Sequence, residues 1–231
     1  MEKQNINSSI ISSLLEVVSV HPLDVYKTKY QQNNSYKFKI FLKQSLNYKY
    51  RGLGSRLVGI VPMRMVFWIS QDIAENRIKY NNLNLFSKGI YVGFYTSLFQ
   101  TIIDSPIENI KISKINNTPI NKNLFRGFYS NYLRNNIFAS SLYICNKYGE
   151  EKNINKFLTG SVGGLIGSII SQPIDYIKTN IQSYKNLSYK QIIYNEKFVY
   201  NCMNGCIARS TISFFSMGIG SFAYNYFKKN L

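Results

Sequence analysis

One short pattern occurs three times in this chain: a proline, any residue, an acid, two further residues and a lysine. Its copies begin at Pro22, Pro106 and Pro173, which are 84 and 67 residues apart, and each follows a largely apolar stretch. Self-similarity at a long period indicates an architecture of repeated supersecondary units. The chain is therefore predicted to fold as three related units.

The residue types in the pattern suit a gate. A proline inside a helix removes one backbone hydrogen bond and bends the helix axis. The acid and the lysine that follow lie on one side of the helix, just past the bend. Three bent helices that meet in a ring could pair the acid of one helix with the lysine of the next. Such a ring would close one end of a central cavity, as repeats with broken helices do in many transporters.

A second element follows each copy of the pattern. It is an aromatic residue, an arginine and a glycine at 50–52 and 125–127, and the degraded Met203-Asn204-Gly205 in the last copy. Each opens another apolar segment, so each unit contains a bent helix, a link, a turn and a second helix. We predict three units over 1–84, 85–153 and 154–231, with helices over 8–31, 55–79, 87–115, 128–149, 156–183 and 206–229.

Small residues at a spacing of four precede the prolines. Before the second and third prolines they are Gly89, Gly93, Ser97, Gly160, Gly164 and Ser168. Faces of this kind let helices approach closely in a membrane. Their coincidence with the prolines favours a tightly packed helical bundle.

The mean hydropathy of −0.16 is low for a membrane protein, but the distribution of charge is more informative. Residues 89–103, 157–174 and 210–227 carry no charge, and the last two runs are 18 residues long. A membrane span needs roughly 20 largely apolar residues. Borderline runs with polar interruptions suit helices that line a wet cavity better than helices surrounded by lipid.

The net charge of +17 could indicate a nucleic-acid-binding protein. The basic residues lie between apolar runs, however, and no nucleic-acid-binding module is recognisable, so we expect no nucleic-acid partner. A basic cavity that attracts anions is the better interpretation. The three cysteines form no metal motif, and no nucleophile with a base is visible. We therefore predict a protein that is not an enzyme and uses no metal or cofactor.

Taken together, these motifs resemble the mitochondrial carrier family, of solute carrier 25 type, over essentially the whole chain. The resemblance implies an all-α membrane fold of six transmembrane helices in three pseudo-symmetric repeats. It also implies a multi-pass protein of the mitochondrial inner membrane that works by alternating access. We expect a monomer that contacts membrane lipid such as cardiolipin.

The resemblance implies a matrix-side gate built from the acids and lysines of the three patterns, braced from below by glutamines. At matching positions the chain has Asp24, Lys27, Gln31, Glu108, Lys111, Asp175, Lys178 and Gln182. Ile115 stands where the middle glutamine would be, so one brace is missing.

A second gate, on the cytoplasmic side, is implied on the even-numbered helices, and its pattern is degraded here. Its candidate residues are Asp72, Glu75, Lys147, Glu150 and Lys228. The family's pairing would join Lys228 to Asp72 and Lys147 to Glu75, leaving Glu150 to face only Asn225. We expect a weak gate, because exposed ion pairs contribute only about 0–1 kcal/mol each.

Carriers of this kind contact substrate about seven residues past each arginine–glycine turn. The matching positions, with the arginines near them, are Arg56, Gly59, Ile60, Arg64, Arg134, Asn135, Arg209 and Ile212. Arg134 is the best single candidate, because arginine in a membrane segment is costly and its fork suits carboxylate or phosphate. For Arg64 and Arg209 the alternative is that they pair with acids or face lipid headgroups.

Three hypotheses remain for the function. Several arginines fit a polyanion, and we expect exchange of nucleotides such as dATP, dTTP or ADP. A composition rich in Asn, Lys, Ile and Tyr, with short links, suits a parasite or a large DNA virus, whose product would act in a host cell. The Arg134–Asn135 pair instead resembles carriers of keto acids, which makes a carboxylate carrier the alternative. The degraded second gate leaves a non-transporting membrane adaptor as the third hypothesis.

Overall fold

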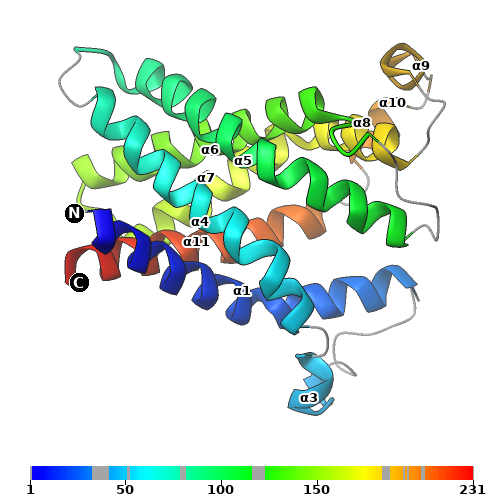
Figure 1. Ribbon diagram of the computed structural model, residues 1–231, viewed down its shortest axis with the longest axis horizontal. Coiled ribbons are helices and arrows are strands. Elements are labelled where there is room, and N and C mark those ends of the chain that lie inside the picture. Colours follow the sequence, from blue (N-terminus) through cyan, green and yellow to red (C-terminus); the bar gives the residue numbers. More distant parts are fainter. Residues whose placement is uncertain are drawn as a thin grey trace.

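Helices account for almost all of the residues that the computed structural model describes (Figure 1). The structure describes residues 2–32, 42–50, 53–78, 82–115, 123–183, 188–194, 196, 198–203 and 206–230. No strand occurs within these ranges. The all-helical fold expected from the sequence is thus confirmed for the described residues.

The long helices begin and end close to the predicted positions. They are α1 (Glu2–Gln32), α4 (Leu53–Ile78), α5 (Leu85–Ile115), α6 (Phe128–Glu151), α7 (Lys156–Ile170) continued by α8 (Gln172–Ser183), and α11 (Cys206–Asn230). Three short helices lie in the links: α3 (Leu46–Lys49), α9 (Tyr189–Ile193) and α10 (Phe198–Met203). The prediction of six long helices is confirmed, with the fifth divided in two.

The three prolines of the repeated pattern act differently. Helices α1 and α5 continue through Pro22 and Pro106. The fifth helix instead breaks at Ser171, and α7 and α8 meet at 59°. Pro173 lies in the first turn of α8, where its missing N–H costs least.

The long helices form a closed ring. Each packs chiefly against two neighbours, in the order α1, α4, α5, α6, α7, α11 and back to α1. Helix α8 continues beneath α7 and contacts α6 and α5. In Figure 1 the two chain termini lie together at one end of the ring, and α9 and α10 lie at the other. The ring therefore has two distinct ends.

Glycines set the close approach of α7 to both of its neighbours. A Cβ added at Gly164 would lie 2.8 Å from the carbonyl oxygen of Ser213 on α11. On the opposite side, a Cβ at Gly163 would lie 2.9 Å from Cα of Leu142 on α6. Because these contacts are with backbone atoms, which cannot move aside easily, the small-residue faces identified in the sequence are packing surfaces.

The second arginine–glycine turn ties three helices together. Gly127 has a φ of 76°, a left-handed conformation that glycine adopts without strain. The side-chain amide of Asn109 on α5 donates to the carbonyl oxygens of Leu124 and Arg126, over 2.7 and 3.0 Å. Arg126 in turn donates from Nε to the carbonyl oxygen of Ile181 on α8, over 2.7 Å. The turn thus fixes the start of α6 against α5 and α8.

The distribution of polar and apolar side chains is the reverse of a soluble protein's. Serines, threonines, asparagines and acids fill much of the interior, whereas large apolar side chains such as Ile207, Val58 and Phe86 are 85, 79 and 66% exposed. A soluble protein rarely exposes so many large apolar residues. An apolar exterior around a polar interior suits lipid surroundings.

Length and composition alone give fewer candidate spans than six. Residues 6–23 of α1 and 57–78 of α4 are long and apolar enough to cross a membrane, and α7 with α8 could form a third, bent span. In the other long helices, buried polar residues lower the mean hydropathy. On α5, for example, Gln100, Thr101 and Asp104 all face the interior.

Candidate functional site

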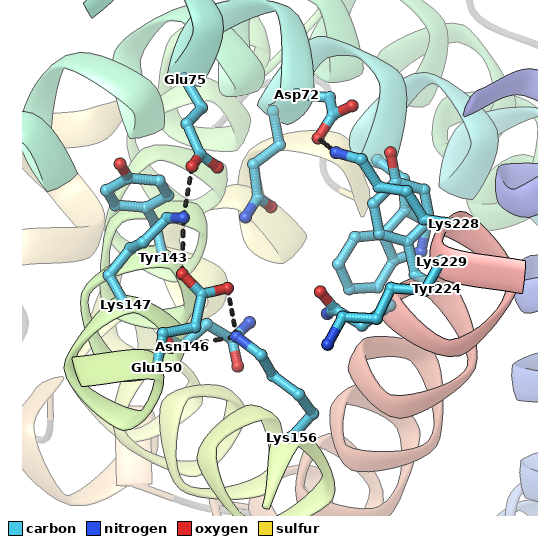
Figure 2. Close-up of a pocket in the computed structure, with 13 residues that line it drawn as sticks. Asp72, Glu75, Tyr143, Asn146, Lys147, Glu150, Lys156, Tyr224, Lys228 and Lys229 are labelled. Atoms are coloured by element: carbon cyan, nitrogen blue, oxygen red, sulfur yellow. Dashed lines mark hydrogen bonds and ion pairs between the residues drawn. The ribbon is translucent and has the colours of Figure 1, made fainter. Parts of the chain in front are cut away.

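A cavity of about 300 Å³ opens at the end of the ring where the chain termini lie (Figure 2). Its walls come from α4, α6 and α11, with one residue from the start of α7. The lining residues are Trp68, Gln71, Asp72, Glu75, Tyr143, Asn146, Lys147, Glu150, Lys156, Tyr224, Asn225, Lys228 and Lys229. All five residues predicted for the cytoplasmic-side gate are among them.

Two ion pairs at this cavity join the helices that the sequence pairing named. Lys228 on α11 contacts Asp72 on α4, and Lys147 on α6 contacts Glu75 on α4. Figure 2 shows these pairs on opposite sides of the opening. The contacts agree with the predicted pairing, while their function as a gate stays a prediction.

The expectation for Glu150 was wrong. We expected it to face only Asn225, but its carboxylate pairs with Nζ of Lys147 at 2.6 Å and also with Lys156. Lys156 is the first residue of α7 and follows α6 after a very short link, so it lies next to the end of α6. The family pairing considers only even-numbered helices and could not include this lysine. Asn225 instead donates to the carbonyl oxygen of Ser221, over 2.9 Å.

Aromatic side chains that sequence reasoning did not single out also line the cavity. Trp68 and Tyr224 stack with ring centroids 5.1 Å apart and 13° between the ring planes. The ammonium group of Lys228 lies 5.6 Å from the centroid of the Tyr224 ring. A cation and two stacked aromatic rings therefore lie together on one wall of the cavity.

Deeper in the ring, a second cluster of charges surrounds Arg134. Its Nη2 donates to Oδ2 of Asp104 on α5 over 2.9 Å, and its Nη1 donates to Oδ1 of Asp175 on α8 over 3.0 Å. Glu108 lies 3.6 Å from Nη1. The neighbouring Asn135 accepts from both Nε and Nη2 of Arg134. One guanidinium thus holds acids from α5 and α8 together.

The acids around Arg134 also contact other cations. Lys178 on α8 pairs with Glu108, the contact that the matrix-side gate requires between the second and third patterns. Nη1 of Arg209 on α11 lies 3.6 Å from Asp175 and donates to Gln172 over 2.9 Å. The described cluster therefore contains three cations (Arg134, Lys178 and Arg209) and three carboxylates (Asp104, Glu108 and Asp175).

Arg64 lies apart from this cluster. Its Nε is 2.9 Å from Oε1 of Glu16 on α1, and Ser216 on α11 donates to the same oxygen. Glu16 and Asp104 were both missed by sequence reasoning. The signal was available, because each is an acid within a largely apolar helix, where ionisable residues are costly and usually functional.

The structure describes the side chains of only some of the remaining predicted site residues. The side chains of Asp24, Lys27, Gln31, Arg56 and Lys111 lie outside the part of the chain that the structure describes. Gly59, Ile60 and Ile212 are half-buried on α4 and α11. The amide of Gln182, predicted to brace a gate pair, donates to the carbonyl oxygen of Arg126 over 3.3 Å.

The cavity and the Arg134 cluster are separate in this structure. Arg134 precedes the lining residue Tyr143 by nine positions, which corresponds to about 13 Å along α6. The described lining of the cavity includes none of the predicted substrate-contact residues. Charged contacts thus occur at two levels of one helical ring.

Comparison with known proteins finds similarity to one family. The profile described as mitochondrial carrier protein matches residues 149–231. A mitochondrial carrier-like protein of Acanthamoeba polyphaga mimivirus is 29% identical over 192 residues, covering 75% of this chain and 76% of the relative. The matching profile and this relative are of the mitochondrial carrier family, which is the family that this chain resembles.

Other relatives have named substrates. The mitochondrial 2-oxodicarboxylate carrier of Rattus norvegicus is 24% identical and covers 74% of this chain and 72% of its own length. The mitochondrial aspartate-glutamate transporter of Saccharomyces cerevisiae is 23% identical over 77% of this chain, which matches 25% of that protein. Members of the mitochondrial carrier family are membrane transporters of small metabolites rather than enzymes.

Proposed function

We propose that this mitochondrial carrier exchanges small carboxylate metabolites across the mitochondrial inner membrane by alternating access. In this proposal all six long helices span the bilayer as three repeats, 1–84, 85–153 and 154–231, and the monomer is the transporting unit. The apolar exterior and the closed ring of helices support this arrangement. Lipids such as cardiolipin would surround the apolar surface.

The observation that carries the proposal is the guanidinium of Arg134. Its two Nη atoms already bind carboxylates, Asp104 at 2.9 Å and Asp175 at 3.0 Å. A substrate carboxylate that replaced one of these acids would find the same donors at the same distances. Arginine suits this exchange because its planar fork matches a carboxylate and stays charged when buried.

The balance of charge favours carboxylates over the nucleotides expected from the sequence. That expectation depended on an excess of arginines. The three candidate arginines whose side chains the structure describes, Arg64, Arg134 and Arg209, each pair with an acid. A triphosphate would need several uncompensated cations, whereas a small carboxylate needs only one shared arginine. Relatives named for aspartate, glutamate and 2-oxodicarboxylates support the same choice.

Uptake into liposomes that contain the purified protein tests the proposal. The liposomes would be loaded with a mixture of glutamate, 2-oxoglutarate, ADP and phosphate, and each labelled compound would be offered outside in turn. We expect exchange of glutamate, of 2-oxoglutarate or of both, competed by other small dicarboxylates. Exchange of ADP or dATP alone would instead establish a nucleotide carrier. Folded protein that exchanges none of these anions would favour the adaptor hypothesis.

A further inference from the structure

Asp104 breaks the three-fold pattern of the repeats beside the substrate arginine. It lies two residues before Pro106, and the matching positions before the other two prolines hold the uncharged residues Val20 and Ser171. It also lies one turn before Glu108 on the same face of α5. One repeat alone thus adds an acid next to Arg134, where an asymmetric substrate needs an asymmetric site.

Asp104 is the most deeply buried of the acids that contact Arg134. Besides Arg134 at 2.9 Å, its Oδ2 accepts from the amides of Asn131 at 3.1 Å and Asn135 at 3.4 Å. These three donors all belong to α6, which packs directly against α5. The Asp104 side chain is 1% exposed, and that of Asp175 is 25% exposed.

This difference decides which acid a substrate can replace. Asp175 comes from α8, in another repeat, and reaches Arg134 where α8 packs against α6. Alternating access moves repeats relative to one another, so the contact between α6 and α8 can open while the packing of α5 on α6 persists. A substrate carboxylate would then bind Nη1 of Arg134 in place of Asp175, with Asp104 still on Nη2.

We infer that Asp104 makes the site select carboxylates that carry a protonated amine on the adjacent carbon, as acidic α-amino acids do. This inference rests on the proposed function and narrows its substrate class. The α-carboxylate would bind Arg134, and the ammonium group would face the carboxylate of Asp104. A 2-oxo acid or a plain dicarboxylate offers no cation there and leaves Asp104 opposite substrate oxygen atoms.

A competition assay with the wild-type protein tests this selectivity. Uptake of labelled glutamate would be competed with unlabelled glutamate, 2-oxoglutarate or glutarate, which is glutamate without its amine. A hydrogen bond between charged groups corresponds to a preference of roughly tenfold or more for glutamate. Equal competition by glutarate would overturn the inference, although carboxylate exchange itself would still support the proposed function.

Substitution of Asp104 tests whether this residue causes the preference. Asp104→Asn keeps the shape and one acceptor oxygen but removes the charge, so the ratio of glutamate to 2-oxoglutarate uptake should fall about tenfold. Asp104→Glu should retain most of the ratio. Asp72→Asn is the matched control, because it neutralises an acid at the cavity and should change both uptakes alike. An unchanged ratio in folded Asp104→Asn protein would contradict the inference.

Discussion

The two charge clusters of the ring use the same chemistry at different depths. At the cavity, the Lys228 side chain is 38% exposed opposite Asp72, whereas in the inner cluster that of Lys178 is 4% exposed opposite Glu108. Exposed pairs contribute about 0–1 kcal/mol, but removing one partner of a buried pair costs roughly 3–5 kcal/mol. The inner cluster therefore holds the ring together more strongly than the cavity pairs do.

The depth of a cluster also limits what can bind there. Water reaches the cavity end, so its ion pairs are screened and can open at little cost. In the Arg134 cluster, Asp104 and Lys178 are only 1 and 4% exposed, so a carboxylate that leaves this cluster without a replacement would leave buried charge uncompensated. Exchange of one carboxylate for another is thus the reaction that the inner cluster suits.

The largest expected effect is on the stability of the protein, which should fall more when a lysine is removed from the inner cluster than when one is removed from the cavity. Lys178→Ala removes a lysine that is 4% exposed and leaves the half-buried Glu108 with only Arg134, at 3.6 Å. Because this breaks the most buried ion pair of the inner cluster, we expect the free energy of unfolding to fall by about 3 kcal/mol. Lys228→Ala is the matched substitution at the cavity and should cost about 1 kcal/mol or less. Thermal unfolding of the detergent-solubilised proteins measures both. Equal losses would show that burial does not distinguish the two clusters.

Reversing the charge of one residue at the cavity should have an intermediate effect on substrate exchange. Asp72→Lys places two lysines together, and we expect substrate exchange to fall about fivefold, the equivalent of roughly 1 kcal/mol. Adding Lys228→Asp should restore part of the rate by forming the reversed pair. Lys229→Asp is the control, because Lys229 lines the same cavity without a described ion pair to Asp72. Equal rescue by the control would argue against a specific pair.

The smallest expected effect concerns the third side of the cavity. Asn225→Lys would place a cation on α11 opposite Glu150 and complete the pairing that the family pattern implies. Because Glu150 already contacts two lysines, we expect the exchange rate to fall by about twofold or less. Asn225→Gln adds length without charge and should leave the rate unchanged. A large decrease with Asn225→Lys would mean that this side is the main gate.

Much of the fold could be predicted because its signals are local. Prolines, arginine–glycine turns and spaced small residues mark helix positions, and Gly163 and Gly164 do face opposite neighbours of α7. The break of the fifth helix at Ser171 could not be predicted from its proline, since α5 carries the same proline pattern and continues through it.

The candidate site was harder to predict because its contacts join distant segments. The sequence identified Arg134, but no local pattern showed that Asp104 and Asp175 would neutralise it from two other helices. Among the described residues, these acids offset the positive charge that the sequence led us to expect around a nucleotide. Lys156 was missed for a related reason, since its contact with Glu150 depends on the short link between α6 and α7.

The most direct test of the account compares two arginine substitutions in the liposome exchange assay. Arg134→Ala removes the proposed carboxylate-binding group, while Arg77→Ala removes an exposed arginine that lies 5.0 Å from the centroid of the Tyr95 ring. Because loss of Arg134 leaves the buried Asp104 without its arginine, thermal unfolding would first establish that both proteins are folded. Uptake of labelled glutamate and 2-oxoglutarate would then be followed for each. We predict that Arg134→Ala loses exchange to the level of protein-free liposomes and that Arg77→Ala keeps it. Normal exchange by Arg134→Ala would contradict the central claim that this arginine binds the substrate.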